Sequence, residues 1–197
     1  MKTSFKILIP TILLMFIMLF AVYFNVRAEI NKYVSGEISI KQNKLESFNN
    51  IVLNTKKSVS LFISDKNIVY GDIDMNNYKI INDTLYVSDS ENIRIDFKNL
   101  NSIISVDKAD IFIDSLYNNR FEIGMRNNSG ISVRKGTIKN LIVNCDSSRI
   151  YINNNCYLSN IEGELKNNSF LKFNSRINSI KIKSDTSSFF NTYGWRN

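Results

Sequence analysis

The stretch MRNNSGISV, residues 125–133, decides the fold because its plan recurs along the chain. It consists of an apolar residue, a charged residue, small polar residues, and then an alternation of apolar and polar positions. CDSSRIYI (145–152) and LKNNSFLKF (165–173) follow the same plan. Asn, Asp and Ser favour turns, and period-two alternation of β-branched residues is typical of strands. The pattern therefore predicts a polar corner and a strand, repeated about every twenty residues.

Apolar positions line up in columns when the chain is folded at this period. The residues before each corner are Val87, Val106, Met125, Cys145, Leu165 and Ser184. Two positions earlier stand Leu85, Ile104, Ile123, Val143, Gly163 and Ile182. After the corner come Ile93, Ile111, Ile131, Ile150, Phe170 and Phe189. A third side carries Ile138, Leu158 and Ile177. No single turn can bury such an apolar face, so successive turns must stack on one another.

These columns predict an all-β fold, namely a parallel β-helix (solenoid) of about 19–20 residues per turn. Roughly six or seven turns are expected over residues 48–192. The turn that contains Gly130 has one residue more than the turn with the corner at 146–148. This extra residue predicts a small bulge at Gly130. Gly163 stands in an inward column, which predicts a local void or a kink.

Charges of alternating sign occupy the first position of each predicted corner. This structural ladder consists of Asp107, Arg126, Asp146, Lys166 and Asp185. Stacked about 4.8 Å apart, such neighbours attract, and each exposed pair stabilises the fold by about 0.2–1 kcal/mol. The next positions are Asn, Ser or Thr in most turns, whose side chains can hydrogen-bond along the rod.

The N-terminal segment is apolar. Residues 7–24 form an uncharged run of 18 residues, which is close to the length needed to span a bilayer. Lys2 and Lys6 precede the run, so the positive-inside rule places the N-terminus in the cytoplasm and the bulk of the chain in the periplasm or outside the cell. A signal peptide cleaved after Ala28 and a buried helix are the alternatives.

Four segments follow from these patterns. They are a signal anchor or transmembrane helix at 1–28, a linker at 29–47, the β-helix domain at 48–192, and a C-terminal tail at 193–197.

Composition restricts the function. The chain has 25 Lys and Arg against 18 Asp and Glu, a net charge of +7 that is spread along the sequence. A nucleic-acid binder would carry a denser basic patch, so no nucleic-acid partner is expected. There is no histidine, which removes the commonest general base and metal ligand. No catalytic, cofactor-binding or metal-binding residue is predicted.

Three groups of residues, namely cysteines, carboxylates and aromatic residues, each allow more than one interpretation. Cys145 lies in an inward column and is expected to be a buried thiol, although a disulfide with Cys156 is possible in an oxidising compartment. Carboxylates such as Asp107 and Asp146 could form the acid pair of a polysaccharide-cleaving enzyme, but surface pairing explains them better. Four aromatic residues could stack on sugars, while Trp195 and Phe190 are better explained as a cap on the last turn. Those aromatic residues are Tyr151, Tyr157, Tyr193 and Trp195.

The entry LESFNNIVLNTKKSVSLFI (45–63), the segment INDTLYV (81–87) and the later I-x-I turns resemble the family named putative autotransporter adhesin, head GIN domain. The resemblance covers about residues 45–192. The start MKTSFKILI and the following apolar run look like the membrane-anchored members from Bacteroidetes. Asn and Ser stand where the family often has Gly in its corners. The resemblance implies a parallel β-helix outside the cytoplasm, an adhesive role, and no catalytic residues.

The expected function is therefore a non-enzymatic, membrane-anchored module of the cell envelope that binds a cell-surface glycan or an envelope protein. A β-helix carbohydrate-active enzyme, either a hydrolase or a lyase with surface carboxylates, is the alternative. A purely structural envelope protein without a ligand is the third possibility.

Overall fold

The computed structural model describes residues 15, 18–27, 42–71, 75–88, 93–174 and 177–192. The chain divides into two compact units, Met1–Ile40 and Lys41–Asn197. In the first unit, residues 15 and 18–27 are helical. No helix within the described residues has both the length and the apolar character to cross a membrane. Most of the predicted 7–24 span, residues 29–41 of the predicted linker, and the 193–197 tail with Tyr193 and Trp195 lie outside the described residues.

The second unit is built from strands. They are β1 (Gln42–Lys44), β2 (Asn50–Asn54), β3 (Ser58–Ile63), β4 (Ile68–Tyr70), β5 (Tyr78–Ile81), β6 (Thr84–Ser88), β7 (Ile93–Phe97), β8 (Ser102–Ser105), β9 (Asp110–Met125), β10 (Gly130–Asp146), β11 (Arg149–Lys166), β12 (Phe170–Phe173), β13 (Ser179–Ser184) and β14 (Phe189–Thr192). One 3-10 turn, η1 (Met75–Asn77), precedes β5. β1 falls within the stretch predicted as a linker.

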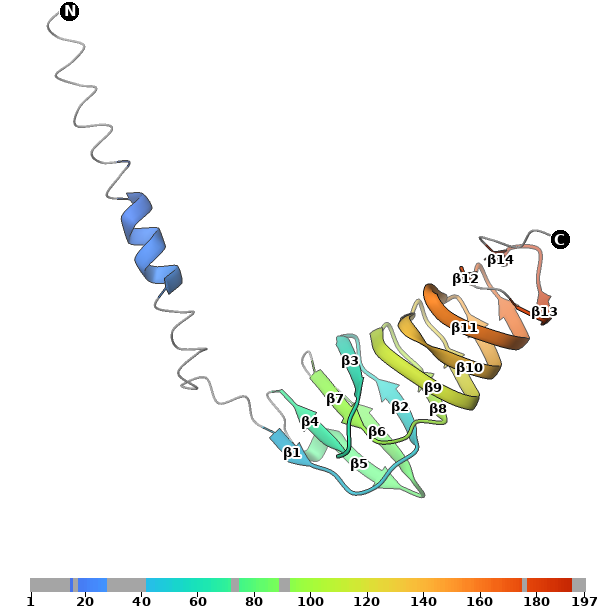
Figure 1. Ribbon diagram of the computed structural model, residues 1–197, viewed down its shortest axis with the longest axis horizontal. Coiled ribbons are helices and arrows are strands. Elements are labelled where there is room, and N and C mark those ends of the chain that lie inside the picture. Colours follow the sequence, from blue (N-terminus) through green and yellow to red (C-terminus); the bar gives the residue numbers. More distant parts are fainter. Residues whose placement is uncertain are drawn as a thin grey trace, which may run out of the picture. The chain divides into compact units, whose positions relative to one another are not determined.

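Residues from β8 onward coil as a β-solenoid, as predicted (Figure 1). Ile123 pairs in parallel with Ile103 on one side and Val143 on the other. Val143 pairs with Gly163, which pairs with Ile182. These steps from 103 to 182 amount to four successive turns of 20, 20, 20 and 19 residues. The prediction of six or seven regular turns is wrong because the earlier strands do not continue the coil in chain order.

The earlier strands form two further rungs in an exchanged order. β2 lies between β6 and β8, and β3 lies between β7 and β9 (Figure 1). Leu53 therefore separates Val87 from the next rung, and the predicted direct step from Val87 to Val106 is wrong. Beyond β6 and β7 lie antiparallel strands, with β5 on β6, β4 on β7, and β1 on β4. They cover a sheet edge that would otherwise be open to pairing with another chain.

The predicted register is wrong by one residue at β8. Ile103, not Ile104, pairs with Ile123, and Ser105, not Val106, pairs with Met125. Ser105 is fully buried. Its hydroxyl is satisfied there because it donates to the carbonyl of Asp107 at 2.9 Å and hydrogen-bonds the Ser129 hydroxyl at 2.9 Å. A polar residue thus takes a core position. A prediction from period-two alternation alone places its apolar neighbours, Ile104 and Val106, in the core instead.

A second register error concerns β12 and β14. Leu171 and Phe190 continue the inward column of Ile150. Phe170 pairs with Arg149, Phe189 pairs with Phe170, and both rings point outward. The corners explain the error. A corner is counted between the aligned residues before it (Met125, Cys145, Leu165, Ser184) and after it (Gly130, Arg149, Phe170, Phe189). The corners at 126–129, 166–169 and 185–188 have four residues, while the corner at 146–148 has three. The short corner is the exception, so Gly130 is not an extra residue and pairs in register with Asp110 and Arg149.

The irregularity predicted at Gly130 lies further along the strand. The pairing of β10 with β11 shifts between Val133 and Lys135, which face Ile152 and Asn155. The bulged residues therefore belong to β11, at positions 153–154.

The corners combine left-handed asparagines with buried serines. Asn127 and Asn128 have φ of 55° and 62°, and Asn167 and Asn168 repeat these values within one degree. Asn tolerates this conformation better than most residues. The residue that ends each corner is a serine with little or no exposure, in the stack Ser129, Ser148, Ser169 and Ser188. Each of the first three hydroxyls donates to a carbonyl of its own corner, so the polar stack is satisfied inside the rod.

Gly163 has a backbone conformation that other residues rarely adopt. Its φ is +144°, and a Cβ built on it would lie 1.8 Å from the carbonyl oxygen of Val143. The backbone of β10 fills the space beside it, so there is no void on that side, and the parallel pairing continues through Gly163 without a shift of register. Gly136 has the same geometry against the carbonyl of Leu116, with φ of +151°.

Candidate binding face

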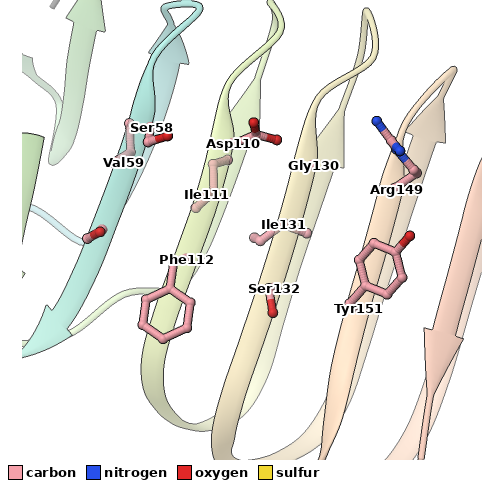
Figure 2. Close-up of a pocket in the computed structure, with 11 residues that line it drawn as sticks. Ser58, Val59, Asp110, Ile111, Phe112, Gly130, Ile131, Ser132, Arg149 and Tyr151 are labelled. Carbon is pink, nitrogen blue, oxygen red and sulfur yellow. The ribbon is translucent and has the colours of Figure 1, made fainter. Parts of the chain in front are cut away.

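The side of the rod formed by β3, β9, β10 and β11 carries a shallow groove. It has a volume of about 330 Å³ and lies on the outer face of these parallel strands (Figure 2). Its floor is β10, where the outward residues are Gly130 and Ser132. The outward residues of β9 and β11 flank this floor, and the lining continues past β9 to Ser58, Val59 and Ser60 of β3. Because outward residues of paired strands stand side by side, the register fixes which residues face each other across the groove.

Two aromatic side chains flank Ser132. Phe112 pairs with Ser132 on one side, and Tyr151 pairs with it on the other. They are 37% and 40% exposed, which is unusual for large apolar side chains on a sheet. Figure 2 shows the two rings on either side of Ser132, one from β9 and one from β11. The side chain of Ser132 between them is small, so it leaves the edges and faces of both rings open to a ligand.

Gly130 lies on the same outer face of β10, two residues before Ser132, and side chains of opposite charge flank it. Asp110 and Arg149 are its two register partners, and Figure 2 shows their charged groups at the same end of the groove. Within the described part of the chain, no ion pair joins them. A Cβ on Gly130 would lie 3.0 Å from Oδ1 of Asp110. The glycine therefore keeps the floor open beside the carboxylate.

Other aromatic rings extend this face along the rod. The ring of Phe62 lies 6.5 Å from that of Phe112. Phe170 lies 5.7 Å from Tyr151 and 4.9 Å from Phe189. The groove is thus a gap in a row of aromatic side chains, and only the small residues of β10 interrupt the row.

A second aromatic pair occurs on the bend of the same strands. Tyr117 and Tyr157 both pair with Thr137 and are 61% and 74% exposed. β10 is therefore small where β9 and β11 are aromatic, at two separate places. Between these places Arg134 and Lys135 form ion pairs with Asp114 and close the gap.

The predicted charge ladder is partly brought together. Arg126, Asp146, Lys166 and Asp185 occupy the first corner position of successive turns. Asp107 does not share that position because the register shift at β8 moves it one residue along, to the level of Asn127. No ion pair joins ladder members in the described structure; Lys166 pairs with Glu164 at 2.8 Å, and Asp107 approaches Lys56 at 4.0 Å.

The ladder carboxylates are acceptors for corner groups. Asp146 accepts from the side chain of Asn167 at 2.8 Å, which is the main reason that its pKa is lowered. Asp185 accepts from the backbone N–H of Asn167 at 2.7 Å, which lowers its pKa to about 2. The pKa of Asp114 is lowered as well, first by the hydroxyl of Ser115. A general acid needs the opposite shift, so these three carboxylates are suited to accepting hydrogen bonds.

The two cysteines are free and buried. Cys145 stacks between Met125 and Leu165, and burial raises the pKa of its thiol to about 12. Cys156 pairs with Gly136, and burial raises its pKa to about 11. Within the described residues, no cluster of three or more His, Cys, Asp or Glu is arranged to hold a metal ion.

No family model and no curated protein matches the sequence. Among solved structures, the fold is similar to a "putative adhesin" from Bacteroides fragilis NCTC 9343, with a TM-score of 0.55 and 14% identity, over 77% of this chain and 95% of that chain. A "putative lipid binding protein" from Parabacteroides distasonis ATCC 8503 matches with a TM-score of 0.40 and 14% identity, over 78% and 96% of the two chains. At such identity the first likeness supports the solenoid fold alone, and the second adds no argument.

The groove was not predicted from the sequence, although Tyr151 was named as a sugar-stacking candidate. Phe112 stands between two inward isoleucines, so a period-two reading assigns it to the solvent face without giving it a role. The informative signal is the register: only the alignment of 112, 132 and 151 shows an aromatic, a small and an aromatic residue side by side.

Proposed function

We propose that the chain is a non-enzymatic binding module of the cell envelope, held at the membrane by residues 7–24 with its N-terminus in the cytoplasm and its solenoid outside. Lys2 and Lys6 before the apolar run support this orientation. The module belongs, in this proposal, to the GIN-domain family of adhesins that its 45–63 segment resembles. Its partner is a cell-surface glycan or an envelope protein.

One observation carries the binding role: the groove over Gly130 and Ser132, with exposed aromatic rings on both flanks. Rigid parallel strands position these rings, so little ordering entropy is lost when a ligand contacts them. The described carboxylates with shifted pKa values, Asp114, Asp146 and Asp185, are all shifted downward. This favours binding over acid–base turnover at those positions.

A glycan array combined with a hydrolysis and lyase screen on the full chain tests this function. We expect binding of at least one glycan class without release of reducing ends or unsaturated products. Turnover that Asp110→Asn or Asp114→Asn abolishes would replace the proposal with an enzymatic one. Absence of binding to any glycan or envelope protein would favour a purely structural protein.

The membrane attachment is tested separately by the intact mass of the protein extracted from membranes. Retention of residues 1–28 is expected for an anchor. A mass equal to that of residues 29–197 would identify a cleaved signal peptide.

A further inference from the structure

The groove on β9, β10 and β11 combines three properties on one set of register partners. Its floor is small, its middle has an aromatic ring on each flank, and one end has a carboxylate and a guanidinium on opposite flanks. Each property restricts the ligand, and together they restrict it to one chemical class.

The width of the groove suits one six-membered ring. Phe112 and Tyr151 are attached two strands apart, a span of about 9.6 Å. Carbon atoms in contact lie about 3.5–4.0 Å apart, so a thin ring touching both flanks needs about 7–8 Å, and a puckered ring needs slightly more. A pyranose over Ser132 would place its C–H groups against both aromatic side chains.

The charges at Gly130 specify the substituents. Arg149 presents a planar donor fork that matches a carboxylate, and it is the only cation on the described groove lining. Asp110 offers acceptor oxygens and suits hydroxyl donors on the other flank. An acyl chain offers neither group, and a neutral sugar leaves the guanidinium without a charged partner.

We propose, on the basis of the binding role argued above, that this groove binds a uronic-acid residue of an acidic polysaccharide, with its ring between Phe112 and Tyr151 and its carboxylate on Arg149. A hydroxyl next to the carboxylate, on the same edge of the ring, bonds to Asp110. The residues after the apolar run carry 23 Lys and Arg (25 minus Lys2 and Lys6) against 18 Asp and Glu, and this positive balance raises the local concentration of such a polyanion and makes its capture dependent on salt.

The test uses the full chain in detergent micelles, with polygalacturonate and the neutral polymer dextran as probes in affinity electrophoresis and calorimetry. The groove variants are Tyr151→Ala, Ser132→Trp and Arg149→Ala. Tyr157→Ala is the matched control because Tyr157 lies on the same strand, is more exposed, and is outside the groove. The thermal midpoint of each variant is measured to establish that it is folded.

Wild-type protein is expected to retain polygalacturonate in preference to dextran. Tyr151→Ala and Ser132→Trp should weaken binding by about tenfold or more, as for central aromatic contacts in other interfaces. Arg149→Ala should reduce both the preference for the acidic polymer and the dependence on salt, while Tyr157→Ala should have no effect.

Two results would overturn the uronic-acid assignment while leaving a binding function in place. One is unchanged polygalacturonate binding in folded Tyr151→Ala and Ser132→Trp. The other is groove-dependent binding of phosphatidylglycerol vesicles without binding of polygalacturonate. Failure of the wild-type protein to bind any glycan would overturn both the assignment and the glycan-binding part of the proposed function.

Discussion

Replacing Gly163 by alanine should destabilise the solenoid much more than a glycine-to-alanine change usually does. Gly163 has φ of +144°, a conformation that L-residues rarely adopt, and it sits within a continuous parallel ladder. The added Cβ would lie 1.8 Å from the carbonyl oxygen of Val143, on the adjacent turn. That oxygen belongs to the backbone, so it cannot rotate away as a flexible side chain would.

Two costs contribute to the effect. The backbone strain of such a conformation is about 1–3 kcal/mol for a residue other than glycine. Relieving the contact requires β10 and β11 to separate locally, which weakens ladder hydrogen bonds that are each worth about 1 kcal/mol. A total near 3 kcal/mol corresponds to a fall in Tm of about 6–12 °C for a domain of this size.

Thermal unfolding followed by circular dichroism near 215 nm measures the change. Gly124→Ala is the control because a Cβ at Gly124 would lie 3.4 Å from the Ile104 side chain, in ordinary contact. Its Tm should stay within about 2 °C of wild type, since glycine-to-alanine changes at compatible sites cost nothing. If both variants melt at the same temperature, the backbone conformation at Gly163 does not require glycine and the argument is wrong.

Three further predictions concern the corners and the core. Ser129→Ala should lower the free energy of unfolding in urea by about 1–2 kcal/mol, because the carbonyl of Arg126 and the buried hydroxyl of Ser105 lose their partner; an unchanged midpoint would mean that the serine stack adds no stability. The pKa of Asp185 is about 2 in the folded protein, below its usual value of 3.8, so its contribution to stability is complete above pH 3.8 and is lost as pH falls toward 2; Asp185→Asn should flatten the acid side of the Tm profile. Cys145 and Cys156 should react with a thiol reagent only after denaturation, since both are buried; rapid labelling of the native protein would contradict their burial.

Much of the core could be predicted because inward residues alternate with polar ones. Ile123, Val143, Met125 and Cys145 occupy the predicted columns. Two physical effects defeated the same reasoning elsewhere. A hydrogen-bonded serine at 105 replaced an apolar core residue, and corners of unequal length shifted the columns by one position.

Predicting the groove from the sequence would have required these details of the register. With Phe170 assigned to the interior, the row of exposed rings from Phe112 to Phe189 could not be recognised. The exchanged order of the first rungs could not be predicted either, because it depends on pairing between segments that are far apart in sequence. In that order the antiparallel strands β5, β4 and β1 cover the outer edge.

The exchanged order also has a consequence for how the protein is made. β2 and β3 are synthesised before the strands on both of their sides, which lie at 84–97 and 102–113. Until residue 113 has emerged, the first rung lacks a neighbour on at least one edge and is open to pairing with another nascent chain. A chaperone that shields residues 50–63 during synthesis would therefore protect strand edges whose partners have not yet been made.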